Sequence, residues 1–570
     1  MKVQITFPSA KVKEFPSGIT AREILQDEEF QAPRQSAQGK TQDRPGAASA
    51  SDRPIVGALV NNDVVSLTYR IEINSRVEPI LLNTREGATI YRRSLSFLLA
   101  IASHQLFPDR RLVIGHSLGN GFFYHFDGRQ EIPAGELERL REKMVELVEA
   151  GMPIRRQVIS YQEAVSYFAG HRNTDTALLL KNRNDPKIPV YTCGEFMDLA
   201  HAPLAPNTAL LKTFEIMNHP PGFLLRYPPW DSPETLAVFE DNPILFSIYG
   251  EYKNWGKILG VSCVGHLNDL IQQRQVRQFI QVAEALHNKK IAEIADRINE
   301  RRDLVKVVLI AGPSSSGKTT FAKKLCIQLR VLGRNPVPIS LDDYFLPREQ
   351  TPRDEQGNYD FEALEAIDVE LLNRHLVALL GDQEVTLPRF DFHTGTRKAQ
   401  GTALKLPRRA IIILEGIHGL NDRLTPLIEG ALKYKIYVSA LAQLNLDDHN
   451  RISTTDNRLI RRIVRDHQFR GHSALDTLAM WPSVRLGEDR NIFPFQNSAN
   501  SAFNSALDYE LAVLKVYAES LLRSVKPDQK YFHEARRLLS FLGNFTPLPA
   551  NWVPEDSILR EFIGESAFKY

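Results

Sequence analysis

One eight-residue segment constrains the fold of this chain more than any other. Residues 312–319 read Gly-Pro-Ser-Ser-Ser-Gly-Lys-Thr, which matches the phosphate-binding loop (P-loop) pattern of a glycine, four residues and Gly-Lys-Thr. The apolar run 307–311 before it is typical of a buried parallel strand. Phe321, Ala322 and Leu325 then fall on one helical face. We therefore predict a strand, a tight loop and a helix N-terminus. The alternative, a chance match in an ordinary loop, would not require this flanking pattern.

The predicted loop would bind the phosphates of ATP. Its backbone N–H groups would point at phosphate oxygens, while the helix dipole and Lys318 would add positive charge. Thr319 is placed to ligate Mg²⁺, an ion that prefers oxygen ligands. The residues predicted to bind the nucleotide are Gly312, Pro313, Ser314, Ser315, Ser316, Gly317, Lys318, Thr319 and Thr320.

Composition agrees with an ordinary globular protein of about four domains. The 570 residues are 43% hydrophobic and 24% charged, and the net charge of +2 gives no argument for nucleic acid or a membrane surface. Three widely spaced cysteines form no disulfide framework. No stretch approaches the ~20 apolar residues that span a bilayer, and the N-terminus begins as a strand. We expect a cytoplasmic protein without membrane contact.

Hydrophobic patterning divides the chain into five expected parts. Val3, Ile5 and Phe7 alternate with polar residues as a half-buried strand does, and a hairpin is expected around the turn 61–63. Residues 31–54 have the composition of a disordered insertion. The expected parts are a β module at 1–80, a second domain at 81–230, a helical connector at 231–300 with one long helical stretch at 270–298, a P-loop domain at 301–525, and a tail at 526–570 that packs on an earlier domain.

Two predicted strands end in acidic residues. The strand 336–340 runs into Asp342, and the strand 411–414 runs into Glu415. A carboxylate at this end of a strand points into the crevice where α/β sheets bind ligands. We predict Asp342 as the general base with a second role near the metal, and Glu415 as a ligand that reaches Mg²⁺ directly or through water. The alternative for Asp342 is that it only caps a helix.

A run of arginines follows at helical spacing, at positions 458, 461, 462 and 465. An exposed basic helix is one interpretation. The other is that arginines close over a triphosphate, because the planar guanidinium suits phosphate oxygens.

These motifs, in this order, resemble the uridine kinase and phosphoribulokinase group of P-loop kinases. The resemblance covers roughly residues 305–475 and includes Ser340–Phe345, Asn358–Asp360, Phe390–Phe392, Leu414–Ile417 and Arg458–Asp466. It implies a catalytic aspartate at Asp342 with Lys318, Arg462 and Arg465 as catalytic cations, Mg²⁺ ligands at Thr319, Asp342 and Glu415, and an acceptor site of Asp342, Tyr359, Asp360, Phe390, Arg397 and Arg462.

Two departures put the identity of the acceptor in doubt. Uridine kinases carry a base-contacting His at the position of Gly395, and an Arg where this chain has His472. The resemblance thus supports a small-molecule kinase, acting on a hydroxyl of a nucleoside or sugar-bearing compound, more strongly than it supports uridine. The alternative function is a nucleotide-dependent regulatory or RNA-binding ATPase module. The acceptor-side residues Asp342, Asp360 and Arg397 favour the enzyme, since a switch does not need them.

The N-terminal half resembles two modules of threonyl-tRNA synthetase. Residues 1–80 are similar to a TGS domain through the turn 15–20, and residues 90–225 are similar to the editing domain. The paired histidines of an editing site are replaced by Arg93 and Phe97, and His201 remains without the zinc ligands needed beside it. We expect a degenerate editing-like domain without deacylase activity, and RNA as only a weak partner; the oligomeric state is left open.

The expected fold class is therefore multidomain, α/β and α+β. It comprises an N-terminal β-grasp, an α+β editing-like domain, and a P-loop kinase with a parallel β-sheet flanked by helices.

Overall fold

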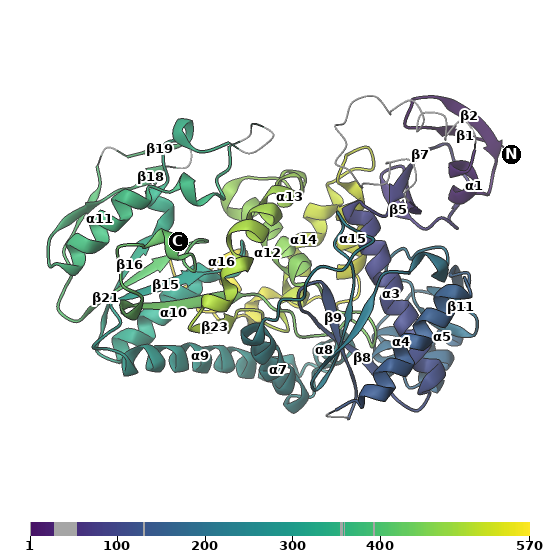
Figure 1. Ribbon diagram of the computed structural model, residues 1–570, viewed down its shortest axis with the longest axis horizontal. Helices are drawn as coiled ribbons and strands as arrows, with labels where there is room; N and C mark the ends of the chain where they lie inside the picture. The colour runs from purple at the N-terminus through teal and green to yellow at the C-terminus, as the bar shows by residue number, and fades with distance from the viewer. Residues whose placement is uncertain are drawn as a thin grey trace.

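The computed structural model describes residues 2–27, 54–128, 131–353, 357, 359–391, 394–398 and 400–569. The predicted insertion at 31–54 lies outside the described residues except at Pro54, and so do Asn358, Phe392 and His393. Figure 1 shows an α/β unit on the left, helices α12 to α14 at the centre, and the N-terminal β module at the upper right.

The N-terminal module is a five-stranded sheet in which the first strand lies between an antiparallel and a parallel neighbour. A capping box begins its short helix, with the Thr20 side chain accepting from the N–H of Glu23. The predicted hairpin is also present, with Asn61 and Asn62 in the left-handed conformation that its turn requires. Its elements are β1 (Lys2–Thr6), β2 (Val12–Pro16), β3 (Ile19–Thr20), α1 (Ala21–Leu25), β4 (Ile55–Val60), β5 (Asp63–Val65), β6 (Arg70–Ile71) and β7 (Ser75–Leu81).

The next region pairs helices with two antiparallel sheets, ordered β10-β11-β12 and β13-β14-β9-β8. Pro220 and Pro221 form the turn of the hairpin between β13 and β14. The elements are α3 (Arg85–Leu106), β8 (Leu112–Ser117), β9 (Gly121–Phe126), α4 (Ala134–Glu149), β10 (Arg155–Ser160), α5 (Tyr161–Gly170), α6 (Thr174–Lys181), β11 (Lys187–Cys193), β12 (Phe196–Leu199), β13 (Glu215–His219) and β14 (Gly222–Arg226).

The connector consists of α7 (Pro243–Ile258), α8 (Val264–Gln272) and α9 (Val276–Glu300). The predicted continuous helical stretch at 270–298 is wrong at its start, since Arg274 adopts φ +59° and separates α8 from α9. A non-glycine residue in this conformation cannot continue a right-handed helix. Helix α9 then runs along α10 beneath the α/β unit (Figure 1).

The α/β unit holds a five-stranded sheet in the order β16-β21-β15-β22-β23, and every pairing in it is parallel. The central strands β15 and β21 read as nearly continuous apolar runs, as strands buried on both faces do. The predicted multidomain fold with a parallel sheet in the C-terminal half is confirmed. Its main elements are β15 (Val307–Ala311), α10 (Lys318–Val331), β16 (Asn335–Ser340), α11 (Val369–Leu380), β21 (Ala410–Glu415), β22 (Lys433–Ser439), α12 (Thr454–Arg470), α13 (Ala474–Asn491), β23 (Ser501–Asn504) and α14 (Glu510–Arg523); two short hairpins pair β17 (Val385–Leu387) with β20 (Thr402–Leu404) and β18 (Phe390–Asp391) with β19 (Thr396–Arg397).

The tail touches both ends of the molecule. Helix α15 (Phe532–Leu542) packs on β5, where Arg536 pairs with Asp63 at 3.2 Å. The short helix α16 (Arg560–Ile563) packs on α12 beside the P-loop. One hydrophobic core cluster accordingly contains residues from 159 to 563. The domain boundaries given above stay a prediction.

Within the described residues, no helix is both long enough and apolar enough to cross a membrane.

Candidate functional site

Three segments of the predicted site meet at one edge of the parallel sheet. Glu415 is the register partner of Ile310 on one side and of Ser340 on the other. The P-loop follows β15, and Asp342 lies two residues beyond the end of β16 in a single 3-10 turn. Because parallel strands end at the same edge, the loop, Asp342 and Glu415 surround one crevice.

The P-loop has the tight backbone that the motif requires. A Cβ at Gly312 would lie 2.0 Å from the carbonyl oxygen of Val438, and Gly317 adopts φ +79°. The hydroxyls of Ser315 and Ser316 are buried without a hydrogen-bond partner among the described residues. Such unsatisfied polar groups in a glycine-bearing loop fit a polyphosphate. Lys318 ends in the same loop, where its Nζ donates to the carbonyl oxygen of Pro313 at 3.2 Å.

Oxygen ligands suited to Mg²⁺ stand opposite this lysine. The side chain of Thr319 lies near the carboxylate of Glu415 and lowers its pKa, and the charges of Asp342 and Lys318 both act on that carboxylate. Burial raises the pKa of Glu415 to about 7, Lys318 opposes the rise, and Asp342 adds to it. Crowded carboxylates of this kind are stabilised by a bound cation. The set of Thr319, Asp342 and Glu415 therefore fits the predicted metal ligands.

Two of the four arginines singled out from the sequence, all on α12, are buried within the protein. Arg458 and Arg461 are 1% and 0% exposed, so both earlier interpretations, an exposed basic face and a lid, are wrong for them. Arg458 pairs with buried Glu488, and Arg461 pairs with buried Glu510. Their guanidinium groups also donate to the carbonyl oxygens of Ser314 and Ser315 respectively.

Arg462 and Arg465, the other two, line the site. Arg462 donates to the hydroxyl of Ser314 at 2.7 Å, and both arginines contact Asp466, at 3.1 and 2.8 Å. The charge of Arg465 also acts on Asp342. Arg462 therefore lies at the P-loop, and Arg465 lies near enough to the predicted base to act on its charge.

Arg397, predicted to contact the acceptor, is held by the protein itself. Its guanidinium donates to Asp368 at 3.0 Å and to the carbonyl oxygens of Tyr344 and Phe345 at 3.1 and 3.2 Å. These carbonyls belong to the segment that carries Asp342. The structure thus places Arg397 where it orders the Asp342 segment.

Of the other residues predicted to bind the acceptor, Phe390 contacts this segment. The backbone N–H of Phe390 donates to Asp343 at 3.2 Å, and its ring lies 5.8 Å from that of Phe345. Asp360 accepts from the N–H of Glu362 at 3.1 Å. Tyr359 stacks under the guanidinium of Arg353 at 4.3 Å.

Three acidic residues of the site were not found from the sequence. Glu488 accepts from the N–H of Ser314 at 2.9 Å, and Glu561 accepts from Thr320. Glu362 faces Arg462 and Lys318, and burial raises its pKa to about 7. Glu488 and Glu561 belong to no short motif, because each reaches the site from a distant part of the chain, whereas Glu362 lies two residues beyond the predicted Asp360.

The loop 447–449 of the α/β unit packs against the editing-like region. His201 contacts Asp447 at 2.6 Å, and His449 contacts Asp198 at 2.9 Å. Phe97, at a position expected for a zinc ligand, packs against Phe196 with ring centroids 5.4 Å apart. His201 is therefore engaged in a contact between the two regions.

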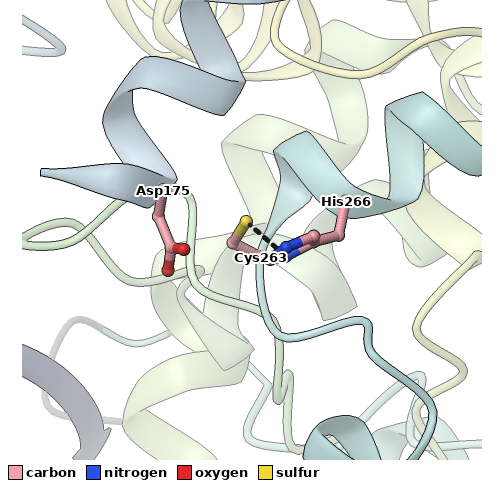
Figure 2. Close-up of side chains that lie close together, drawn as sticks. All are labelled: Asp175, Cys263 and His266. Carbon is pink, nitrogen blue, oxygen red and sulfur yellow. Dashed lines mark hydrogen bonds between the residues drawn. The ribbon is translucent and has the colours of Figure 1, made fainter. Parts of the chain in front are cut away.

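A second group of candidate metal ligands lies nearby (Figure 2). Cys263 and His266 are hydrogen-bonded through Sγ and Nδ1 at 3.1 Å, with Asp175 close to both. Asp175 is already paired with Arg111 at 2.7 Å. Burial raises the pKa of the Cys263 thiol, which keeps it protonated. The half-buried ammonium of Lys253 lies near enough to interact electrostatically with Asp175 and Cys263. A metal ion bound here would be repelled by two cations, Arg111 and Lys253. We therefore interpret the group as a polar packing contact between α6 and α8.

Comparison with curated proteins relates the N-terminal third of the chain to threonine–tRNA ligases. The ligase of Symbiobacterium thermophilum is 31% identical over 218 residues, which cover 38% of this chain and 30% of the ligase. That of Janthinobacterium sp. is 34% identical over 190 residues, 33% of this chain and 29% of the ligase. The similarity thus spans less than a third of the length of these relatives.

Two solved structures give further matches. A possible uridine kinase from Bacillus stearothermophilus is 21% identical with a TM-score of 0.24, over 36% of this chain and 100% of that one. D-glycerate 3-kinase from Cryptococcus neoformans is 15% identical with a TM-score of 0.20, over 44% of this chain and 87% of that one.

The family model described as Phosphoribulokinase / Uridine kinase family matches residues 307–511. This stretch runs from β15 into α14 and contains the P-loop, both acidic strand ends and the arginine helix. The chain therefore carries, at residues 307–511, a domain of the Phosphoribulokinase / Uridine kinase family, preceded by a region that resembles the N-terminal part of threonyl-tRNA synthetases.

Proposed function

We propose that the protein is an ATP-dependent kinase that transfers the γ-phosphate to a hydroxyl of a nucleoside or related sugar-bearing small molecule. The observation that carries the proposal is the convergence of Lys318, Asp342 and Glu415 at one sheet edge, around a P-loop whose buried Ser315 and Ser316 hydroxyls have no hydrogen-bond partner in the described part of the chain. A phosphate cradle, metal ligands, a base and cations are the parts that phosphoryl transfer needs.

Each residue has a definite role in this proposal. The loop amides and the Ser315 and Ser316 hydroxyls hold the β- and γ-phosphates, and Thr319, Asp342 and Glu415 hold Mg²⁺, which neutralises charge on those phosphates when bound. Asp342 accepts the proton as the acceptor oxygen forms its bond to the γ-phosphorus and the bond to the β–γ bridging oxygen breaks, which releases ADP.

The cations act at the same moment. Lys318, Arg462 and Arg465 stabilise the negative charge on the transferring group, because fixed positive groups cost no reorganisation in the transition state. Tyr359, Asp360 and Phe390 contact the acceptor, and Arg397 keeps the Asp342 segment in place through the two carbonyl oxygens of Tyr344 and Phe345.

The test is an ATP-consumption screen of the full-length protein with Mg²⁺, over nucleosides, sugars and phosphosugars, each read against an acceptor-free control. We expect at least one acceptor to yield a phosphorylated product together with ADP, and Lys318→Ala to abolish it. If ATP or tRNA binds but no acceptor is phosphorylated, the regulatory or RNA-binding ATPase module becomes the better description.

A further inference from the structure

The C-terminal segment Asp556–Ile563 lies directly on the P-loop. A Cβ at Gly317 would come within 2.5 Å of Cγ2 of Ile558, so the tail side chain touches the loop backbone. Ile558, Leu559 and Phe562 are buried. This contact is specific packing of the chain end against the predicted nucleotide site.

Glu561 supplies the most informative contact of this segment. Its Oε2 accepts hydrogen bonds from the backbone N–H of Thr320 at 2.9 Å and from the Thr320 hydroxyl at 2.7 Å. Thr320 is the third residue of α10, and the N–H of the next residue, Phe321, is already bonded within the helix to the carbonyl oxygen of Gly317. The N–H groups of this first turn are those that bind anions at a helix N-terminus. Glu561 thus holds a carboxylate where a nucleotide phosphate oxygen would be bound.

Further contacts fix the segment in this position. Lys324, one helical turn after Thr320, donates to the carboxylate of Asp556 at 2.9 Å and to its carbonyl oxygen at 2.8 Å. The guanidinium of Arg461, which also supports the P-loop, lies 4.8 Å from the ring of Phe562. The segment is therefore attached on both sides of Glu561.

The charge of Glu561 also disfavours a nucleotide. It acts on Glu415 and contributes to raising the pKa of that carboxyl group. A nucleotide would add its phosphate charges to the same crevice. A carboxylate and a phosphate cannot share the Thr320 N–H without repulsion of like charges, which the low dielectric of a buried site strengthens.

We propose that Asp556–Ile563 is an autoinhibitory strap, in which Glu561 occupies the phosphate position on Thr320 and must leave before the nucleotide binds. The proposal rests on the proposed nucleotide site and adds its regulation. The apparent affinity for nucleotide is then reduced by the fraction of molecules whose strap is closed.

The test measures ATP binding to the full-length protein by isothermal titration calorimetry. Glu561→Gln retains the shape of the side chain and removes its charge, so we expect about tenfold tighter ATP binding, as for loss of one charge-assisted competitor. Asp556→Asn, which loosens the Lys324 attachment at an exposed side chain, should tighten binding in the same direction. The matched control is Glu565→Gln, whose carboxylate is 85% exposed and pairs with Arg560 but not with Thr320.

Hydrogen exchange supplies a second readout that does not depend on any variant. The amides of residues 556–563 should exchange faster in the wild-type protein when ATP is added. Unchanged or weaker ATP binding by Glu561→Gln, with the melting temperature retained and no faster exchange in this segment, would overturn the strap alone. Absence of ATP and pyrophosphate binding in the wild type and in Glu561→Gln would overturn the proposed nucleotide site and the strap together.

Discussion

Glu488 and Ser314 are joined by a hydrogen bond of 2.9 Å from the backbone N–H of the serine to the glutamate carboxylate. The partner of Glu488, Arg458, donates at 3.1 Å to the carbonyl oxygen of the same serine. Both backbone polar groups of one P-loop residue are thus held by a buried ion pair. We infer that this pair fixes the loop conformation before any nucleotide arrives.

Glu488→Ala should lower the free energy of unfolding by about 3 kcal/mol or more. The substitution leaves the guanidinium of Arg458 buried without its counter-charge, which is the costly way to break a buried pair. Chemical denaturation measures the change. Asp489→Asn is the matched control, because that neighbouring side chain is 48% exposed and its nearest arginine atom lies 3.8 Å away. Equal stability of the two variants would contradict the role given to Glu488.

Lys318→Ala should abolish phosphoryl transfer and leave the fold intact. The Lys318 ammonium ends on the P-loop carbonyl of Pro313, not in the core, and its loss removes charge stabilisation worth on the order of 3 kcal/mol or more in the transition state. Product formation under single-turnover conditions, with circular dichroism as the folding control, measures this. The exposed Arg330 of the same helix offers a control substitution to Ala. Wild-type turnover in folded Lys318→Ala would remove the basis of the kinase assignment.

Asp342→Asn should leave ATP affinity within a few-fold of wild type and reduce acceptor turnover by ~10² or more, because it removes the base while keeping the shape. Separate measurement of ATP binding and of kcat distinguishes the two effects. If ATP binding is lost while the residual rate is kept, Asp342 belongs to the nucleotide site and the role of base is wrong.

Local pattern was sufficient to predict the strand, loop and helix around Lys318, and the acidic end of β21 at Glu415. Apolar runs, glycines and caps act over a few residues, so the sequence shows them directly. Glu488 and Glu561 were missed because their partners in the P-loop lie 174 and 241 residues away along the chain. Nothing local distinguishes either residue from an ordinary surface glutamate.

Helix α12 also shows that local sequence patterns do not predict long-range partners. Helical spacing places Arg458, Arg461, Arg462 and Arg465 near one another, but only packing against α13 and α14 separates the buried pair from the pair that lines the site. The partners Glu488 and Glu510 lie 30 and 49 residues further along the chain. Helical periodicity predicts which residues share a face of α12, but it does not predict which acidic residues of other helices pair with them.

The contact between His449 and Asp198 should make stability depend on pH. Burial alone would lower the pKa of His449, but the carboxylate of Asp198, helped by Asp448 and Asp447, raises it to about 9. Because the folded protein holds this proton more tightly than the unfolded chain, the stabilisation is complete below pH ~6.5 and is lost as the pH rises through about 9.

The corresponding measurement is the free energy of unfolding between pH 6 and 9.5. We expect it to fall across this range by up to roughly 3 kcal/mol, and the slope to flatten in His449→Gln. His171→Gln, at an exposed position, should keep the wild-type slope. If the pH dependence of the unfolding free energy has the same slope in all three proteins, His449 is not protonated in its contact with Asp198.

Uridine should be a poor acceptor, and the reason lies at Gly395. This residue adopts φ +71°, and a Cβ there would lie 2.9 Å from Nε of Arg348. The position at which uridine kinases present a base-contacting histidine therefore carries no side chain and is covered by an arginine. A site that hydrogen-bonds its substrate rejects an analogue by a factor of ~10⁴ when that analogue leaves a buried polar group unpaired. Because this site lacks the histidine side chain, we expect its selection for the pyrimidine edge to be weaker.

Steady-state kinetics with uridine, cytidine, adenosine and ribose phosphates test this expectation. A kcat/KM for uridine well above all the others would restore the plain uridine kinase assignment. Another residue would then have to make the contact that Gly395 cannot.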